Sequence, residues 1–314
     1  MANTPESWPE IWRGGVNTWE CDEMGHMNVR FYVAKAVEGL ATLAALIGLP
    51  EAFCKNAAST LLVREQHIRF HREAHAGAAL HMVGGVAEVG ESEARLVQLL
   101  IHSTTGEVCA SFQTVVVHAT AGEGAAFPWS DRTRRSAEAL VVEIPEQARA
   151  RSLDLSPVET VAGPAVADEL QLMRIGLGAI APQDCDAFGR MRPELFIGRV
   201  SDGIGRLVGP LRAAVAEHAP SRPARTGGAV LEYRLVQLAW PRAGERFELR
   251  SGLVGADART MRLVHWMLEP GTGKVWGTSE AVAITFDLDA RKVVPIAPPA
   301  QAALRAQAKP GLAL

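Results

Sequence analysis

Residues 20–28 read Glu20-Cys21-Asp22-Glu23-Met24-Gly25-His26-Met27-Asn28, and a related stretch returns in the second half of the chain. The second stretch reads Asp184-Cys185-Asp186-Ala187-Phe188-Gly189-Arg190. In both copies an acid, a cysteine, an aspartate and a glycine keep the same spacing, and Tyr32 and Phe196 follow at matching positions. The two aspartates lie about half of the 314-residue chain apart. A period this long indicates two duplicated domains rather than a solenoid.

The segments around the two motifs repeat in the same order. A strand-like stretch precedes each motif, and a helical stretch with apolar residues at helical spacing follows it. Four strand-like segments come next in each half, separated by turn residues. Consecutive strands without intervening helices favour an antiparallel sheet, here wrapped around one long central helix. The expected strands before the motifs are 15–19 and 172–180, the helices are 28–49 and 193–218, and the later strands are 60–72, 79–89, 94–103, 108–118, 229–239, 246–255, 260–268 and 281–288.

This order of elements predicts an α+β protein with two domains, as the chain length also suggests. We expect a first domain over 1–125 with the intact motif and a second over 166–290 with a degenerate motif. The Gly-, Pro- and charge-rich stretch 126–165 is expected to be a linker with one helical piece. The tail 291–314 is Ala- and Pro-rich, which predicts a short helix and a frayed end.

The composition excludes several classes of protein. With a net charge of −3, the chain lacks the excess of basic side chains that nucleic-acid binding requires. No apolar run reaches the roughly 18 residues needed to span a bilayer, so no membrane segment is expected. Residues 1–12 carry Glu6 and Glu10 where a signal peptide has a basic start and an apolar core. The four cysteines form no Cys-x-x-Cys pair, which favours reduced thiols and a cytoplasmic location.

The sequence of a strand, Asp-x-x-Gly-His-x-Asn, a long helix and four strands resembles the hotdog-fold thioesterases. Within them it is similar to the 4-hydroxybenzoyl-CoA thioesterase-like family, whose signature is Asp-x-Asp-x-x-Gly-His-Val-Asn-Asn followed by a Tyr. Here Glu20 replaces the first aspartate and Val29 the second asparagine. The resemblance implies a tandem double hotdog that hydrolyses acyl-CoA to free acid and CoA. It further implies no metal or other cofactor, and a homodimer of pseudo-dimeric chains.

The first motif offers the groups that thioester hydrolysis needs. Asp22 precedes a helix, whose positive end keeps a partly desolvated carboxylate ionised. Backbone N–H groups of the first helical turn, at Val29 and Arg30, are candidates to stabilise an oxyanion. The resemblance implies that Asp22 is the nucleophile or general base, with His26 and Asn28 orienting water or the thioester. The alternative is that Asp22 caps the turn while His26 and Asn28 satisfy the loop backbone.

The second motif keeps Asp186 but has Arg190 and Arg192 where the first has His26 and Asn28. Pro193 removes a backbone donor from the position of the first helical residue. We therefore expect the first motif to be catalytic and the second to be degenerate or to bind an acid or phosphate. The alternative is that both motifs are active.

Other titratable residues are weaker candidates. Glu38 lies in the helix that supplies the acid in some hotdog thioesterases. Glu73 follows the next strand, as a glutamate does in the double-hotdog acyl-ACP thioesterases, although those have Asn where this chain has Met24. The spacing of His67, His71 and His75 suggests a metal face only on a helix. Residues 60–72 alternate like a strand, so His67 and His71 share a strand face while His75 falls in a turn, and no metal is expected.

Three alternatives to an acyl-CoA thioesterase remain. The first is an acyl-ACP thioesterase, the second a non-catalytic acyl-binding hotdog protein, and the third a hotdog dehydratase or hydratase. The intact set of Asp22, His26 and Asn28 in one half favours an enzyme over a binding protein. The Asp and His loop pattern of the dehydratases is not found cleanly. Fold analogy alone does not choose between these functions.

Overall fold

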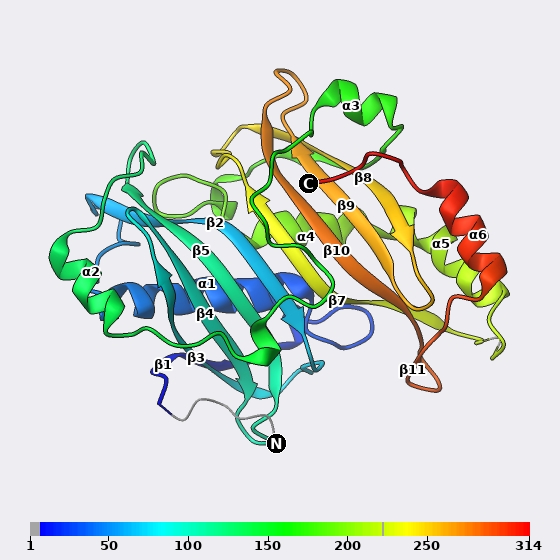
Figure 1. The fold of residues 1–314 in the computed structure, drawn as a ribbon, viewed down its shortest axis with the longest axis horizontal. Coiled ribbons are helices and arrows are strands. Elements are labelled where there is room, and N and C mark those ends of the chain that lie inside the picture. Colours follow the sequence, from blue (N-terminus) through cyan, green and yellow to red (C-terminus); the bar gives the residue numbers. More distant parts are fainter. Residues whose placement is uncertain (1–6, 222) are drawn as a thin grey trace. The chain divides into compact units, whose positions relative to one another are not determined.

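The computed structural model describes residues 7–221 and 223–314, and its contacts divide the chain into two units (Figure 1). Among the described residues, the first unit comprises 7–150 and 181–197, and the second comprises 151–180, 198–221 and 223–314. This division differs from the predicted linker, because residues 126–150 pack with the first unit and the second motif returns to it. Of residues 1–12, where no signal peptide is expected, residues 1–6 lie outside the described residues.

The first unit holds an antiparallel sheet in the order β1-β3-β4-β5-β2. Its strands are β1 (Glu10–Gly15), β2 (Ser59–Phe70), β3 (Ala79–Val89), β4 (Glu93–His102) and β5 (Val108–Thr120). The strand predicted at 15–19 is wrong, because β1 ends at Gly15 and the 3-10 turn η1 (Thr18–Glu20) follows. The Glu20 carboxylate accepts a hydrogen bond from the Asn17 N–H at 2.8 Å, which favours this turn over extended chain.

The long helix predicted after the first motif is confirmed as α1 (Val29–Leu46). Asn28 is its N-cap, with the side-chain oxygen accepting from the Arg30 N–H at 3.0 Å. One face of α1 is buried against the sheet, where the Gln98 amide of β4 donates to the Ala36 carbonyl at 2.8 Å. The opposite face of the sheet packs Val97 and Leu99 against Ala148.

The second unit repeats the pattern with the sheet order β7-β10-β9-β8-β6. Its strands are β6 (Met173–Ala179), β7 (Thr226–Gln237), β8 (Arg246–Ala256), β9 (Met261–Leu268), β10 (Val275–Asp287) and the short β11 (Lys292–Val293) paired with β10. Strand β10 begins well before the predicted residue 281. The turn closed by Gly273, with φ of 75°, lets pairing with β9 resume directly at Val275.

The second predicted helix, 193–218, is wrong as a single helix. The segment forms α4 (Glu194–Gly203) and α5 (Gly205–Glu217). Pro210 lies inside α5 and cannot donate an intrahelical hydrogen bond, and the two glycines flank the break at Ile204. A Cβ at position 203 would overlap the backbone carbonyl of Ile175, so Gly203 permits close approach to β6.

The predicted linker and tail are largely packed structure. The linker carries α2 (Asp131–Glu138), η2 (Glu146–Ala148) and α3 (Pro164–Glu169), and Val142 donates to the Val86 carbonyl at 2.8 Å. The helix expected in the tail is α6 (Pro298–Gln307). The frayed end is wrong, because Leu312 and Leu314 are buried and the Trp266 indole donates to the Ala313 carbonyl at 2.8 Å.

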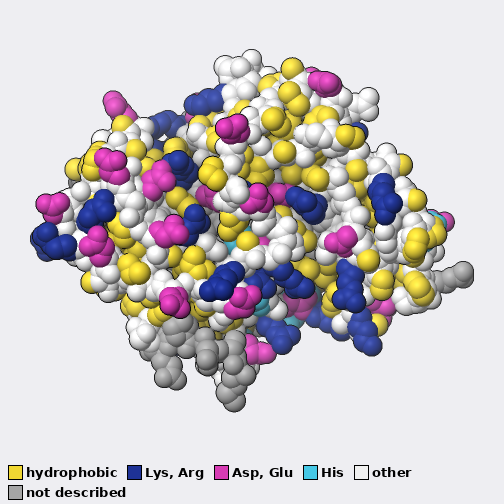
Figure 2. Space-filling model, in the orientation of Figure 1, with side chains coloured by type: hydrophobic (Ala, Val, Ile, Leu, Met, Phe, Trp, Pro, Cys, Tyr) yellow, Lys and Arg dark blue, Asp and Glu magenta, His cyan; other side chains and the backbone are white. Residues whose placement is uncertain are grey.

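Acidic and basic side chains are interspersed over the face shown in Figure 2, in keeping with the small net charge. Among the described residues, no helix is both long enough and apolar enough to cross a bilayer.

A buried histidine in the second unit predicts loss of stability in acid. His265 on β9 is fully enclosed, its Nδ1 lies 2.9 Å from the Ser251 hydroxyl, and burial lowers its pKa to about 3. Below its unfolded pKa of about 6.5, the unfolded chain binds a proton that the folded chain excludes, so stability falls as pH falls from 6.5 toward 3. We expect the buried neutral histidine to lower the free energy of unfolding by about 2 kcal/mol at pH 5 relative to neutral pH.

The measurement is urea unfolding at pH 7.5 and pH 5, with His265→Gln expected to flatten the difference. Burial also lowers the pKa of His71, in the first unit, to about 4. Part of the difference in stability between the two pH values should therefore remain. The control is His218→Gln, since His218 is exposed. If His265→Gln loses as much stability between pH 7.5 and pH 5 as the wild type, His265 is not the source of the acid sensitivity.

Candidate active site

The first motif folds into a tight turn held by Asp22. Its Oδ1 accepts hydrogen bonds from the N–H groups of Met24 at 2.9 Å and His26 at 3.1 Å. Gly25 has φ of 78°, a conformation that favours glycine. The turn-capping role considered for Asp22 is therefore present. Among residues 7–221 and 223–314 its Oδ2 has no hydrogen-bond partner, so one carboxylate oxygen is left for water or substrate.

The start of α1 offers fewer free donors than the sequence suggests. The N–H of Arg30 donates to the Asn28 side chain, and the N–H of Asn28 donates to the Glu20 carbonyl at 2.8 Å. Of the two predicted oxyanion donors, Arg30 is thus engaged by the N-cap. Val29 is the first helical residue, and helix geometry leaves its N–H without an intrahelical acceptor.

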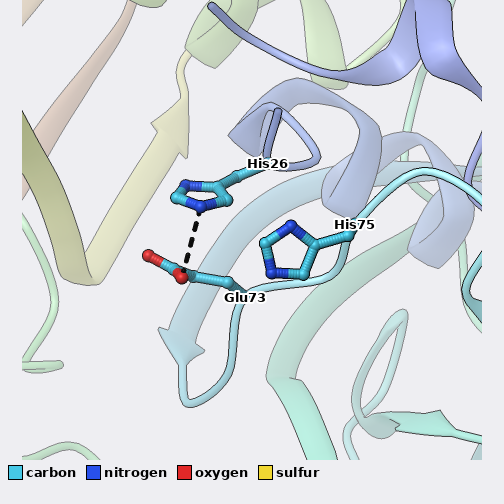
Figure 3. Close-up of side chains that lie close together, drawn as sticks. All are labelled: His26, Glu73 and His75. Carbon is cyan, nitrogen blue, oxygen red and sulfur yellow. Dashed lines mark ion pairs between the residues drawn. The ribbon is translucent and has the colours of Figure 1, made fainter. Parts of the chain in front are cut away.

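Glu73 and His75 come from the loop between β2 and β3 and meet the His26 side chain (Figure 3). His26 Nε2 lies 3.4 Å from Glu73 Oε2, with 12% of the histidine side chain and 38% of the glutamate side chain exposed. The rings of His26 and His75 pack edge to face with centroids 4.8 Å apart. The structure thus brings two predicted residues together, His26 and Glu73, and adds His75, which the sequence assigned to a turn.

A tyrosine fixes the loop that carries Glu73 and His75. The Tyr32 hydroxyl on α1 accepts from the Ala74 N–H at 3.0 Å and lies 3.3 Å from the Arg72 carbonyl. Burial raises the pKa of Tyr32, so the phenol keeps the proton that it donates. The N–H of Met27 donates to the Ala74 carbonyl at 2.7 Å. The backbones of the two loops are therefore joined directly beside the His26–Glu73 contact.

A buried ion pair holds the other side of the motif. Lys35 Nζ lies 2.7 Å from Glu20 Oε1, and both side chains are at least nine-tenths buried. The Lys35 ammonium also lies 5.2 Å from the centroid of the Trp12 ring. Sequence reasoning did not select Lys35. The available signal was a single lysine three residues after Tyr32 on the apolar face of α1.

Glu38 is not part of this arrangement. It is exposed and accepts a hydrogen bond from the Trp12 indole at 2.6 Å. It lies ten residues beyond Asn28 on α1, a rise of about 15 Å. The structure therefore does not bring Glu38 to the turn of Asp22.

The second motif forms the same turn and lies within the first unit. Asp186 Oδ1 accepts from the N–H groups of Phe188 at 2.8 Å and Arg190 at 2.9 Å, and Gly189 has φ of 78°. Arg190 is buried and donates to the carbonyls of Ala121 at 2.5 Å and Gly122 at 3.0 Å. Its guanidinium therefore secures the end of β5, which argues against the predicted role in binding an acid or phosphate.

Glu194 distinguishes the second motif further. It occupies the position that Arg30 has in the first motif, and its carboxylate pairs with Arg192 Nε at 3.2 Å. Burial raises the pKa of Glu194, while Arg192 and Arg30 oppose the shift. A carboxylate at this helix start disfavours an anionic intermediate there. Sequence reasoning did not select Glu194, because one carboxylate at a helix start is common.

The family model of the thioesterase-like superfamily matches residues 16–150 and 180–304. The chain belongs to this superfamily. Its two matched segments are tandem thioesterase-like domains, so the double hotdog predicted from the resemblance is confirmed. Its class of activity is that of a thioester hydrolase, as the sequence analysis predicts.

Solved structures of other members of this fold cover most of the chain at low identity. A 12:0-ACP thioesterase from Umbellularia californica is 11% identical, with a TM-score of 0.61 over 87% of this chain and 92% of its own. An acyl-ACP thioesterase from Bacteroides thetaiotaomicron VPI-5482 is 9% identical, with a TM-score of 0.59 over 87% of this chain and 96% of its own. At this identity the likeness shows the fold. No curated protein matches the sequence.

Proposed function

We propose that this protein hydrolyses an acyl-CoA thioester to free acid and CoA at the first motif. The observation that carries the proposal is the contact of His26 with Glu73 beside the turn of Asp22. This arrangement places the Asp22 carboxylate, with its free Oδ2, in the same turn as His26. The Glu73 carboxylate in turn orients the His26 side chain. A cytoplasmic location and a homodimer remain parts of the proposal.

The roles follow from the bonds that each group makes. Asp22 Oδ2 acts as general base for water, or attacks the thioester carbonyl itself and forms an anhydride that water then cleaves. The Val29 N–H donates to the oxyanion that forms as the carbonyl carbon becomes tetrahedral. When the C–S bond breaks, His26 passes a proton to the departing thiolate. Glu73 acts through His26 and is a positioning residue.

The second motif is proposed to be non-catalytic. Asp186 keeps the turn, but Arg190 is committed to the carbonyls of Ala121 and Gly122, and Pro193 has no N–H. Losing one oxyanion donor typically costs about 3 kcal/mol of transition-state stabilisation. The turn of the second motif then has a structural role, because Asp186 Oδ1 accepts two hydrogen bonds from its own loop.

The competing substrate is an acyl-carrier protein, which two of the similar structures act on according to their names. The discriminating experiment is a thiol-release assay on CoA esters from short to long and aromatic, with an acyl-carrier protein in parallel. Turnover of CoA esters supports the proposal, and turnover of the carrier-protein ester alone would replace its substrate. Absence of turnover with either class would favour an acyl-binding protein.

The roles of His26 and Glu73 give a matched prediction. We expect His26→Gln to lower kcat by about 10²-fold and Glu73→Gln by about 10-fold, with KM changed less than kcat. Glu73→Asp is expected to recover part of the loss by restoring the carboxylate. Equal kcat in wild type and His26→Gln would remove His26 from the mechanism.

A further inference from the structure

We propose that His26, Glu73 and His75 bind one zinc ion. One donor atom from each side chain lies within 4.8 Å of the other two, and Figure 3 shows the three side chains converging. Among the residues that the structure describes, this is the only such group of three or more histidine, cysteine or acidic side chains. The site uses a different set of residues from the His67, His71 and His75 series discounted in the sequence.

The geometry needs little adjustment. Tetrahedral zinc with bonds of about 2.0–2.1 Å places its ligand atoms about 3.3–3.4 Å apart. The separation of His26 Nε2 and Glu73 Oε2 is 3.4 Å, so one edge of the tetrahedron already has the required length. Glu73 and His75 are exposed, and the remaining donor atoms are already within 4.8 Å of one another, so small movements of these two side chains can shorten the other edges.

The histidine tautomer also suits a metal ligand. His75 Nδ1 lies 3.3 Å from the carbonyl oxygen of Gly25. A proton on Nδ1 is donated to that carbonyl, which leaves the lone pair of Nε2 for the metal. Metal-binding histidines commonly donate their second ring N–H to a backbone carbonyl or carboxylate in this way.

The ligand types select zinc over the common hard cations. Calcium and magnesium prefer oxygen ligands, whereas two imidazoles and one carboxylate are a typical zinc set with the fourth position open to water. The supporting backbone is fixed by the Met27–Ala74 hydrogen bond and by the Tyr32 hydroxyl. The backbone of such a site loses little conformational freedom when the ion binds.

Zinc binding does not depend on the proposed hydrolysis, but its effect on turnover does. An ion held by His26 and Glu73 removes the histidine from proton transfer, so zinc is expected to inhibit. The second motif offers no equivalent site, because Arg190 stands at the position of His26.

The test is a competition titration of the full chain with Zn²⁺ against a chromophoric chelator. We expect one ion per wild-type chain and at least about a tenfold loss of affinity in His75→Ala and in Glu73→Gln. The control is His218→Ala, because His218 is also exposed and its Nδ1 also faces a backbone carbonyl, that of Ala214 at 3.0 Å. This variant is expected to bind zinc like the wild type.

The inference is overturned if the wild type binds no stoichiometric zinc, or if His75→Ala binds it unchanged. Zinc sensitivity is measured in each variant relative to its own zinc-free rate, and His75→Ala is expected to be less sensitive than the wild type. If the protein hydrolyses thioesters but binds no zinc, only the zinc inference is overturned. Zinc binding without hydrolysis of any thioester removes the proposed function alone.

Discussion

Asp22→Asn is expected to lower kcat for thiol release by about 10²- to 10⁴-fold, because it removes the carboxylate that acts on water or on the thioester. The amide oxygen of asparagine can still accept the two backbone hydrogen bonds of Met24 and His26. The turn should therefore remain, and the loss should appear in kcat without a matching change in thermal stability. Steady-state kinetics and thermal unfolding of the same preparation check both statements.

The second motif supplies the matched control. Asp186 accepts the same pair of backbone hydrogen bonds in the same turn, so Asp186→Asn repeats the substitution in an equivalent setting. We expect its kcat to stay within about threefold of wild type, since Arg190 and Pro193 leave the second motif without the catalytic groups. If Asp186→Asn abolishes turnover while Asp22→Asn keeps it, the roles of the two motifs are reversed.

Lys35→Met is expected to destabilise the protein by about 3–5 kcal/mol, the usual cost of leaving one partner of a buried ion pair uncompensated. The substitution leaves the Glu20 carboxylate buried without its cation. Because Glu20 also accepts from Asn17 and its carbonyl from Asn28, the first motif should loosen as well. Urea unfolding at pH 7.5 measures the loss.

A double variant separates the charge from the packing. Lys35→Met combined with Glu20→Gln removes both charges and keeps an acceptor for the Asn17 N–H, so part of the stability should return. Arg225→Met is the surface control, because Arg225 and Asp289 form an exposed pair and such pairs contribute little. A double variant no more stable than Lys35→Met would show that lost packing, and not the stranded charge, causes the effect.

Sequence reasoning selected Glu73 only through the resemblance to the double-hotdog thioesterases, for a physical reason. Glu73 lies 47 residues after His26, and their contact depends on how the loop after β2 packs beside the first motif. Nothing local to Glu73 distinguishes it from other loop glutamates. The same holds for His75, which the sequence placed in a turn after the strand that carries His67 and His71, with nothing to connect it to His26.

The sequence by itself determined the duplicated architecture, the two motif turns and the helix α1. Those features rest on short-range interactions: an aspartate that accepts from its own loop, a glycine with positive φ, and apolar residues at helical spacing. The tertiary structure alone decided that His26 meets Glu73 and His75, that Lys35 neutralises Glu20, and that Arg190 is committed to the end of β5. These contacts join residues far apart in the chain, so they depend on strand pairing and helix packing that no local pattern encodes.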